Sequence, residues 1–200
     1  MDDWKKTRKA AANSRRRMIY NNDGDDVFGG HNENGITKKN VTPQAFWEAR
    51  CLGLEDSHLY SIFYCTTVSF NLHTHNSRVA ELYTGSHPNL CSYAGAFIEQ
   101  GRDNLELTID FCRKHGLEIF WSQRMNDTHD NWYPSFFLSA FKREHPELIL
   151  FRPEDIGKPK QGLVEPHMNA TAVDYVKQEI RDRQYEIISD VCERYYVDGI

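Results

Sequence analysis

The chain has 200 residues, of which 40% are hydrophobic and 26% are charged, and its formal net charge is −5. This length suffices for one domain with a buried core, and the composition is ordinary for a globular protein. The acidic balance argues against nucleic acid as a partner of the whole chain, and no apolar run reaches the roughly 18 residues of a membrane span.

Residues 1–16 form a polar segment in which basic side chains are concentrated. Seven Lys and Arg residues lie between Lys5 and Arg17, and no long apolar run follows them. The segment therefore lacks the pattern of a signal peptide, and we expect a cytoplasmic location. We predict a flexible basic tail, with contact to RNA or another acidic surface as the alternative.

The first predicted strand begins at Met18 and stops at the polar run 21–26, as a buried strand does when it ends in a loop. Residues 29–40 are rich in Gly and Asn and predict a further loop. Thr42 and Pro43 then predict a helix start, because Thr caps helices and Pro suits the first helical position. Three apolar side chains of this helix would face inward: Phe46, Trp47 and Leu52.

The second predicted strand, 59–65, is nearly continuous in apolar character, which is typical of a buried parallel strand. The polar stretch 71–76 predicts a loop at the rim of a cleft, and residues 84–92 predict turns. Residues 93–100 fit either a short helix or an extended link. No two of the five cysteines have CxxC spacing, so neither a disulfide framework nor a zinc ribbon is expected.

The second half of the chain repeats the alternation of helix and strand. Residues 104–115 predict a helix with one apolar face that Gly116 ends. A third strand at 117–122 follows. The remaining predicted elements are a helix at 134–144, a long irregular segment at 152–169, a helix at about 173–195 and the start of a fourth strand at 197–200.

This order predicts an α/β fold with a parallel sheet. The first strand lacks the glycine-rich phosphate loop of an open doubly wound sheet, whereas polar side chains follow every strand, as at the active-site face of a barrel. Because three and a half units already occupy 200 residues, we predict a partial TIM-type (β/α) barrel: the first three βα units plus the start of strand four, in residues 17–200, truncated after Ile200. A complete flavodoxin-like domain is the alternative.

Two stretches carry a family resemblance. One is Ala172-Val173-Asp174-Tyr175 with Val191 to Ile200, and the other is Asn104-Leu105 with Phe111 to Phe120, followed by Arg124-Met125-Asn126-Asp127. They resemble the N-terminal half of bacterial glycosyl-hydrolase-like (β/α)8 barrels. The resemblance implies a carbohydrate-active hydrolase whose catalytic acidic residue lies just beyond Ile200, so this half would position substrate.

The predicted substrate-binding residues lie at or beyond the carboxyl ends of the three strands. Hydrogen-bonding side chains there suit sugar hydroxyls, and an aromatic ring suits stacking on a sugar ring. The candidates are Asn22, Asp23, Asp25, Tyr64, Arg124, Asn126, Asp127 and Trp132. Asx turns and internal ion pairs are the competing interpretation of these residues.

Two other functions remain open. His73 and His75 have the H-x-H spacing that holds zinc in amidohydrolase-type enzymes, and His129 and Asp130 could complete such a site. A non-catalytic carbohydrate-binding protein is the third possibility. The favoured hypothesis has a carbohydrate as its substrate and includes no metal and no cofactor.

Overall fold

The computed structural model describes residues 18–29, 41–87, 90–131, 133–150 and 171–200, together with Lys6, Lys9, Ala10 and Asn13. Several predicted features lie largely or wholly outside these residues: the basic tail, the loop at 29–40, the irregular segment at 152–169 and the candidate residue Trp132.

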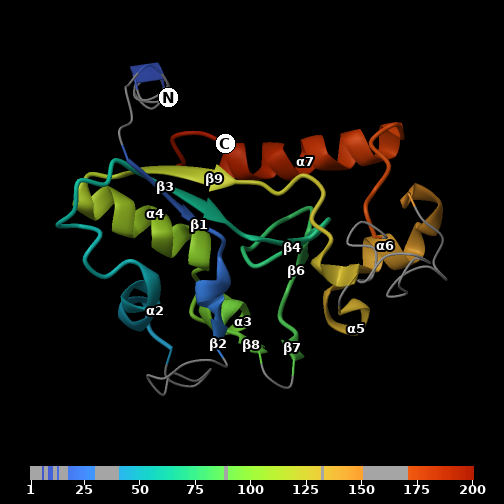
Figure 1. Cartoon of the computed structure of the whole chain (residues 1–200), viewed down its shortest axis with the longest axis horizontal. Coiled ribbons are helices and arrows are strands. Elements are labelled where there is room, and N and C mark those ends of the chain that lie inside the picture. Colours follow the sequence, from blue (N-terminus) through green and yellow to red (C-terminus); the bar gives the residue numbers. More distant parts are fainter. Residues whose placement is uncertain are drawn as a thin grey trace, which may run out of the picture.

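The described structure contains a parallel sheet of three strands (Figure 1). Its strands are β1 (Ile19–Asn22), β3 (Ser61–Cys65) and β9 (Glu118–Ser122), in the order β1-β3-β9. Ser61 lies opposite both Ile19 and Glu118, so the three strands begin in register. These are the three strands that the sequence predicts.

The predicted partial TIM-type barrel is wrong, because the sheet does not close. In the described residues β1 pairs with β3 alone, and beyond β9 there is only an isolated bridge between Phe120 and Gly199. The segment that the sequence assigns to loops and turns instead forms two further small sheets. One is β2 (Phe28–Gly29), β8 (Leu90–Ser92) and β7 (Ser86–His87); the other is β4 (Thr67–Ser69), β5 (Leu72–His73) and β6 (Glu81–Leu82).

The helices begin and end at recognisable caps. Thr42 Oγ1 accepts a hydrogen bond of 3.1 Å from the Ala45 amide at the start of α2 (Pro43–Arg50). Asp103 caps α4 (Asn104–His115), and Gly116 ends it in the left-handed conformation at φ 69°. The other helices are α3 (Ala94–Glu99), α5 (Pro134–Phe137), α6 (Ala140–Glu144), α7 (Gln178–Arg194) and the short 3-10 turns η1 (Asp25–Val27), η2 (His129–Asn131) and η3 (Pro146–Leu148).

Three local predictions are wrong. The helix predicted at 134–144 is two short helices, because Ser139 has an extended backbone and caps α6. Leu52, predicted to face inward, is 69% exposed. The polar stretch 71–76, predicted as a cleft rim, is mostly buried and contributes β5.

The main core lies on one face of the parallel sheet. Ile62, Tyr64, Ile119 and Trp121 are fully buried there, and α2, α4 and α7 contribute to the same apolar cluster. In Figure 1, α4 lies alongside the strands. The opposite face is only partly covered within the described residues: Phe63 and Phe120 stack there with ring centroids 4.5 Å apart and remain half-buried.

None of the helices in the described part of the chain is both long and apolar enough to cross a membrane.

Candidate functional site at the carboxyl edge of the parallel sheet

The carboxyl ends of β1 and β9 place four charged or titratable side chains at one edge of the sheet. They are Asp23, Asp25, Arg124 and His129, and their side chains are between 36% and 61% exposed. Parallel strands bring these loops together although the residues are about a hundred positions apart in sequence. The pKa of Asp25 responds to Arg124 and His129, and that of Arg124 responds to Asp23, so the two loops form one electrostatic unit.

Arg50, at the end of α2, holds the β1 side of this edge. Its Nη1 donates to Asp23 Oδ1 at 3.1 Å, and its Nη2 lies 4.0 Å from Asp25 Oδ2. Burial and the neighbouring Asp23 raise the pKa of Asp25 above its usual range. The two carboxylates therefore sit beside one cation and still face solvent, where they can accept hydrogen bonds from a ligand.

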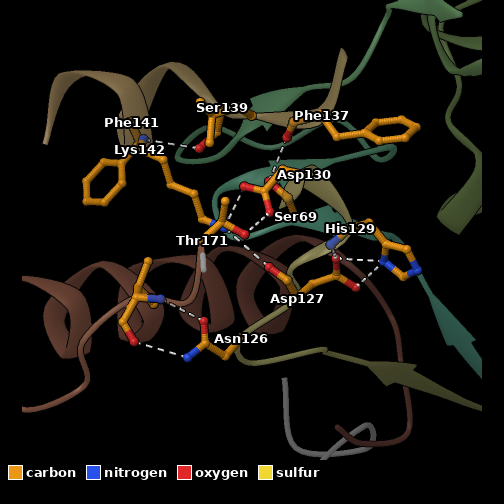
Figure 2. A network of polar contacts seen from close by, with 12 residues as sticks. Ser69, Asn126, Asp127, His129, Asp130, Phe137, Ser139, Phe141, Lys142 and Thr171 are labelled. Carbon is orange, nitrogen blue, oxygen red and sulfur yellow. Dashed lines mark hydrogen bonds and ion pairs between the residues drawn. The ribbon is translucent and has the colours of Figure 1, made fainter. Parts of the chain in front are cut away.

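On the β9 side, a buried carboxylate orients an exposed imidazole (Figure 2). His129 Nδ1 donates to Asp127 Oδ1 at 2.8 Å, and the His129 amide donates to the same oxygen at 3.0 Å. Arg124 Nη1 donates to the other oxygen at 3.2 Å. Asp127 is almost inaccessible to solvent, whereas 60% of the His129 side chain is exposed.

This pairing shifts both pKa values in the direction of an ion pair. The hydrogen bond to Asp127 raises the pKa of His129 although burial opposes that shift. Burial alone would raise the pKa of Asp127, but the hydrogen bonds from His129 and the charge of Arg124 bring it below its usual value. With Nδ1 engaged, Nε2 is the ring atom that can exchange a proton or hydrogen bond with a bound molecule.

A network of buried polar side chains lies behind the exposed residues of this edge. Tyr64 Oη donates to Asp26 Oδ1 at 2.8 Å, and Asn22 Nδ2 donates to Asp26 Oδ2 at 2.8 Å. Asn104 Nδ2 in turn donates to Tyr64 Oη at 3.0 Å. Burial raises the pKa of Asp26 to about 6, although both hydrogen bonds counteract the shift. The network ties the end of β1 to β3 and to the start of α4.

A second network holds the loop after β9 (Figure 2). Lys142 Nζ lies 2.7 Å from Asp130 Oδ2 in an ion pair with no solvent exposure, and it also donates to the Asp127 carbonyl at 3.3 Å. Thr171 Oγ1 donates to Asp130 Oδ1 at 2.5 Å. Asn126 makes two hydrogen bonds to the backbone of Val173. The loop that presents Arg124 and His129 is therefore fixed by buried contacts.

The alternative zinc site is not supported by this arrangement. His73 and His75 are fully buried, and both rings pack against Trp121. The ring centroids of the two histidines are 5.1 Å apart. His129, in contrast, is exposed on the loop after β9. Burial lowers the pKa of His75 to about 3, and burial also lowers the pKa of His73 well below its usual value. Among the described residues, no group of three or more His, Cys, Asp or Glu side chains is arranged to hold a metal ion.

The structure divides the predicted site residues into two groups. Asp23, Asp25 and Arg124 reach solvent at the edge, and Asp127 supports them from within. The side chains of Asn22, Tyr64 and Asn126 form hydrogen bonds within the protein instead. His129, which the sequence suggested only as a zinc ligand, is the residue that was missed; its D-x-H spacing from Asp127 was the available signal.

No protein-family model matches the sequence, and no curated protein matches it.

Proposed function

We propose that the carboxyl edge of the parallel sheet binds a carbohydrate, and that Asp23, Asp25, Arg124 and His129 contact its hydroxyl groups. The supporting observation is the convergence of exposed acceptors and donors from β1 and β9 on one edge. Sugar hydroxyls both donate and accept hydrogen bonds, so carboxylates beside a guanidinium and an imidazole complement them.

The two supporting networks favour binding because they fix the edge before a ligand arrives. Asp127 orients His129, and the buried Lys142–Asp130 pair anchors the same loop. A site that is held in place by buried partners loses less conformational entropy on binding than a mobile one. If the ligand is cleaved, His129 is the group at this edge best arranged to exchange a proton with it.

Saturation-transfer NMR with cellotriose, maltotriose, xylotriose and N,N′-diacetylchitobiose tests the proposal. At least one saccharide should receive saturation from the protein. Its saturation-transfer signal should level off as the saccharide concentration is raised. Asp25→Asn should raise its dissociation constant about tenfold, because hydrogen bonds to charged groups contribute about 1.5–3 kcal/mol. Asp56→Asn is the matched control, since Asp56 is an exposed carboxylate before β3, at the opposite end of the sheet.

The absence of saturation transfer from every saccharide would count against the proposal, as would equal loss of affinity in Asp25→Asn and Asp56→Asn. Incubation of a bound saccharide with the protein, followed by mass analysis of the products, separates a hydrolase from a binding protein.

A further inference from the structure

Asp26 places a buried carboxyl group behind the carboxyl edge of the parallel sheet. The group accepts hydrogen bonds from Tyr64 Oη and Asn22 Nδ2, and both donors are neutral. Among the described residues no cation bonds to it, because Arg50 donates to Asp23 instead. A buried carboxylate with only neutral partners is costly to keep ionised, so it takes up a proton more readily than an exposed one. Asp26 retains 9% of its surface in solvent, through which a proton can exchange.

A chain of hydrogen bonds runs to this carboxyl group from the first residue of α4. Asn104 Nδ2 donates to Tyr64 Oη at 3.0 Å and to Thr74 Oγ1 at 3.0 Å, and Tyr64 Oη donates to Asp26 Oδ1 at 2.8 Å. Asn104 Oδ1, in contrast, is buried and has no hydrogen-bond partner among the described residues. Rotation of this amide by 180° exchanges its oxygen and nitrogen, and so brings an acceptor to the two hydroxyl groups.

A protonated Asp26 needs an acceptor, and its two partners differ in this respect. Asn22 presents an N–H group to it, while the Asn22 oxygen already accepts from the Gly24 amide at 2.9 Å. The Tyr64 hydroxyl can both donate and accept, and it stays protonated because burial raises the pKa of Tyr64 well above its usual value. The acidic proton therefore sits on Oδ1 and points to Tyr64, while Oδ2 keeps the hydrogen bond from Asn22.

The Tyr64 hydroxyl then needs an acceptor for its own hydrogen, and the rotated Asn104 amide supplies one. The Thr74 hydroxyl donates to the same oxygen and gives up only a long contact of 3.4 Å to the Thr66 carbonyl, which still accepts from the Thr74 amide at 2.9 Å. One polar atom of the amide lacks a partner in either state. We propose that Asp26, Tyr64 and Asn104 form a pH-sensitive switch, in which uptake of one proton from solvent by Asp26 reverses the direction of these hydrogen bonds.

The charged groups around Asp26 set the pH at which this switch operates. Arg50, at the end of α2, favours the ionised carboxylate, whereas Asp25, in the same 3-10 turn, favours the protonated form. Tyr20 and Cys51 also interact with Asp26, but burial raises the pKa of both, so they stay neutral near pH 6. Burial has the largest effect and raises the pKa of Asp26 to about 6. As the pH rises through this value, the carboxyl edge gains one negative charge behind its exposed residues.

NMR titration of the folded chain between about pH 4.5 and pH 8 tests the switch. The ¹³C resonance of the Asp26 carboxyl group reports its protonation, and the side-chain N–H resonances of Asn104 report the direction of the hydrogen bonds. Both should titrate with one midpoint near pH 6. The Asn104 protons should move upfield as the pH falls, because they lose both acceptors. If they stay fixed while Asp26 titrates, or if Asp26 does not titrate in this range, the proposal is wrong.

Three variants separate the switch from a general electrostatic effect. Asp26→Asn imitates the protonated carboxyl group, so the Asn104 resonances should take their low-pH positions and stop responding to pH. Tyr64→Phe breaks the chain, so Asp26 should titrate with a higher pKa while Asn104 no longer follows it. Asp25→Asn is the matched control: Asn104 should still respond, with a lower midpoint, because a neighbouring negative charge is removed. Melting curves establish that each variant is folded. An Asn104 response that persists in Tyr64→Phe, or that disappears in Asp25→Asn, would overturn the proposal.

Discussion

His129 combines an exposed ring with a buried anionic partner, and this combination decides how its charge depends on pH. The hydrogen bond to Asp127 raises its pKa, whereas the positive charge of Arg124 lowers it. Below the unfolded pKa of about 6.5 the protonated ring pairs with Asp127 and stabilises the fold. This contribution is lost as the pH rises through the higher pKa of the folded state.

Titration of the His129 Cε1–H resonance by NMR measures the effect. Asp127→Asn should lower the pKa of His129, because it removes the carboxylate partner. Arg124→Gln is the paired variant and should raise it, because it removes the nearby cation. A pKa that moves in the same direction in both variants would show that the contacts of Asp127 and Arg124 are not those of the folded protein in solution.

Lys142 and Asp130 are a buried ion pair whose members depend on each other. Burial lowers the pKa of Lys142 and raises that of Asp130, whereas the charge of each partner opposes the shift of the other. Asp130→Asn should cost about 3–5 kcal/mol, because it leaves an ammonium group buried without its anion. Lys142→Met combined with Asp130→Asn should recover much of that loss. Urea unfolding of the wild type, both single variants and the double variant gives the coupling energy; additive losses would contradict the pairing.

From the sequence, candidate site residues can be selected only by the rule that they follow a predicted strand. That rule finds Asp23, Asp25 and Arg124, which do reach solvent together. It does not distinguish them from Asn126, whose amide instead binds the Val173 backbone 47 positions away. Whether a polar side chain faces solvent or an internal partner depends on long-range contacts, and these leave no local pattern.

Among the elements, α4 shows how one residue can cap a helix and also connect distant segments. Asp103 Oδ1 accepts from the Glu106 amide at 2.9 Å, and Glu106 Oε2 accepts from the Asp103 amide, which completes a capping box. Asp103 Oδ2 also accepts from the Asn76 amide and from Tyr195 Oη. The cap of α4 therefore holds the segment after β5 and the end of α7.

Asp103→Ala should destabilise the protein by more than the roughly 1 kcal/mol of a simple N-cap, because it also removes the acceptor of the Asn76 amide and one of the two acceptors of Tyr195 Oη. Glu106→Ala is the control, since it breaks the other half of the capping box and keeps the long-range contacts. The free energy of unfolding in urea should fall by about 2–4 kcal/mol for Asp103→Ala and by less than about 1 kcal/mol for Glu106→Ala. Equal losses would show that the distant contacts contribute nothing.

Helix ends that carry a local signal were predictable. Thr42-Pro43 starts α2, and Gly116 ends α4, as the sequence predicts. The short strands β4 to β8 were not predictable, because they have two or three residues each and carry no alternation. Their pairing also buries the polar segment that was expected at a cleft rim.

For the whole molecule, the same limit explains the failed barrel expectation. Alternation of strands and helices correctly gives parallel neighbours, but closure requires pairing between strands at the two sheet edges, which the order of elements does not encode. In the described residues the chain between β3 and α3 forms small antiparallel and mixed sheets instead. The sequence pattern therefore predicts the parallel sheet but does not predict the architecture around it.

Burial of His73 and His75 makes the stability of the whole fold sensitive to acid. His75 Nδ1 is hydrogen-bonded to Thr66 Oγ1 at 2.8 Å, but its Nε2 and both ring nitrogens of His73 have no partner among the described residues. Because burial depresses both pKa values, the folded state keeps the rings neutral while the unfolded state protonates them. Stability is complete above about pH 6.5 and falls as the pH drops toward the folded pKa, which is about 3 for His75.

Urea unfolding between pH 5.5 and pH 4 should show this loss as a slope of about 1.4 kcal/mol per pH unit for each buried histidine, in addition to the carboxylate contributions. His73→Leu should reduce the slope by one such increment, because it replaces an unpartnered imidazole with an apolar side chain of similar size. His129→Gln should lower stability across this range and leave the slope unchanged, because the raised pKa of His129 keeps its ring protonated in both states there. If His73→Leu and the wild type lose stability at the same rate, His73 is not a neutral core residue in solution, and the packing of the polar segment around β5 must differ from that described.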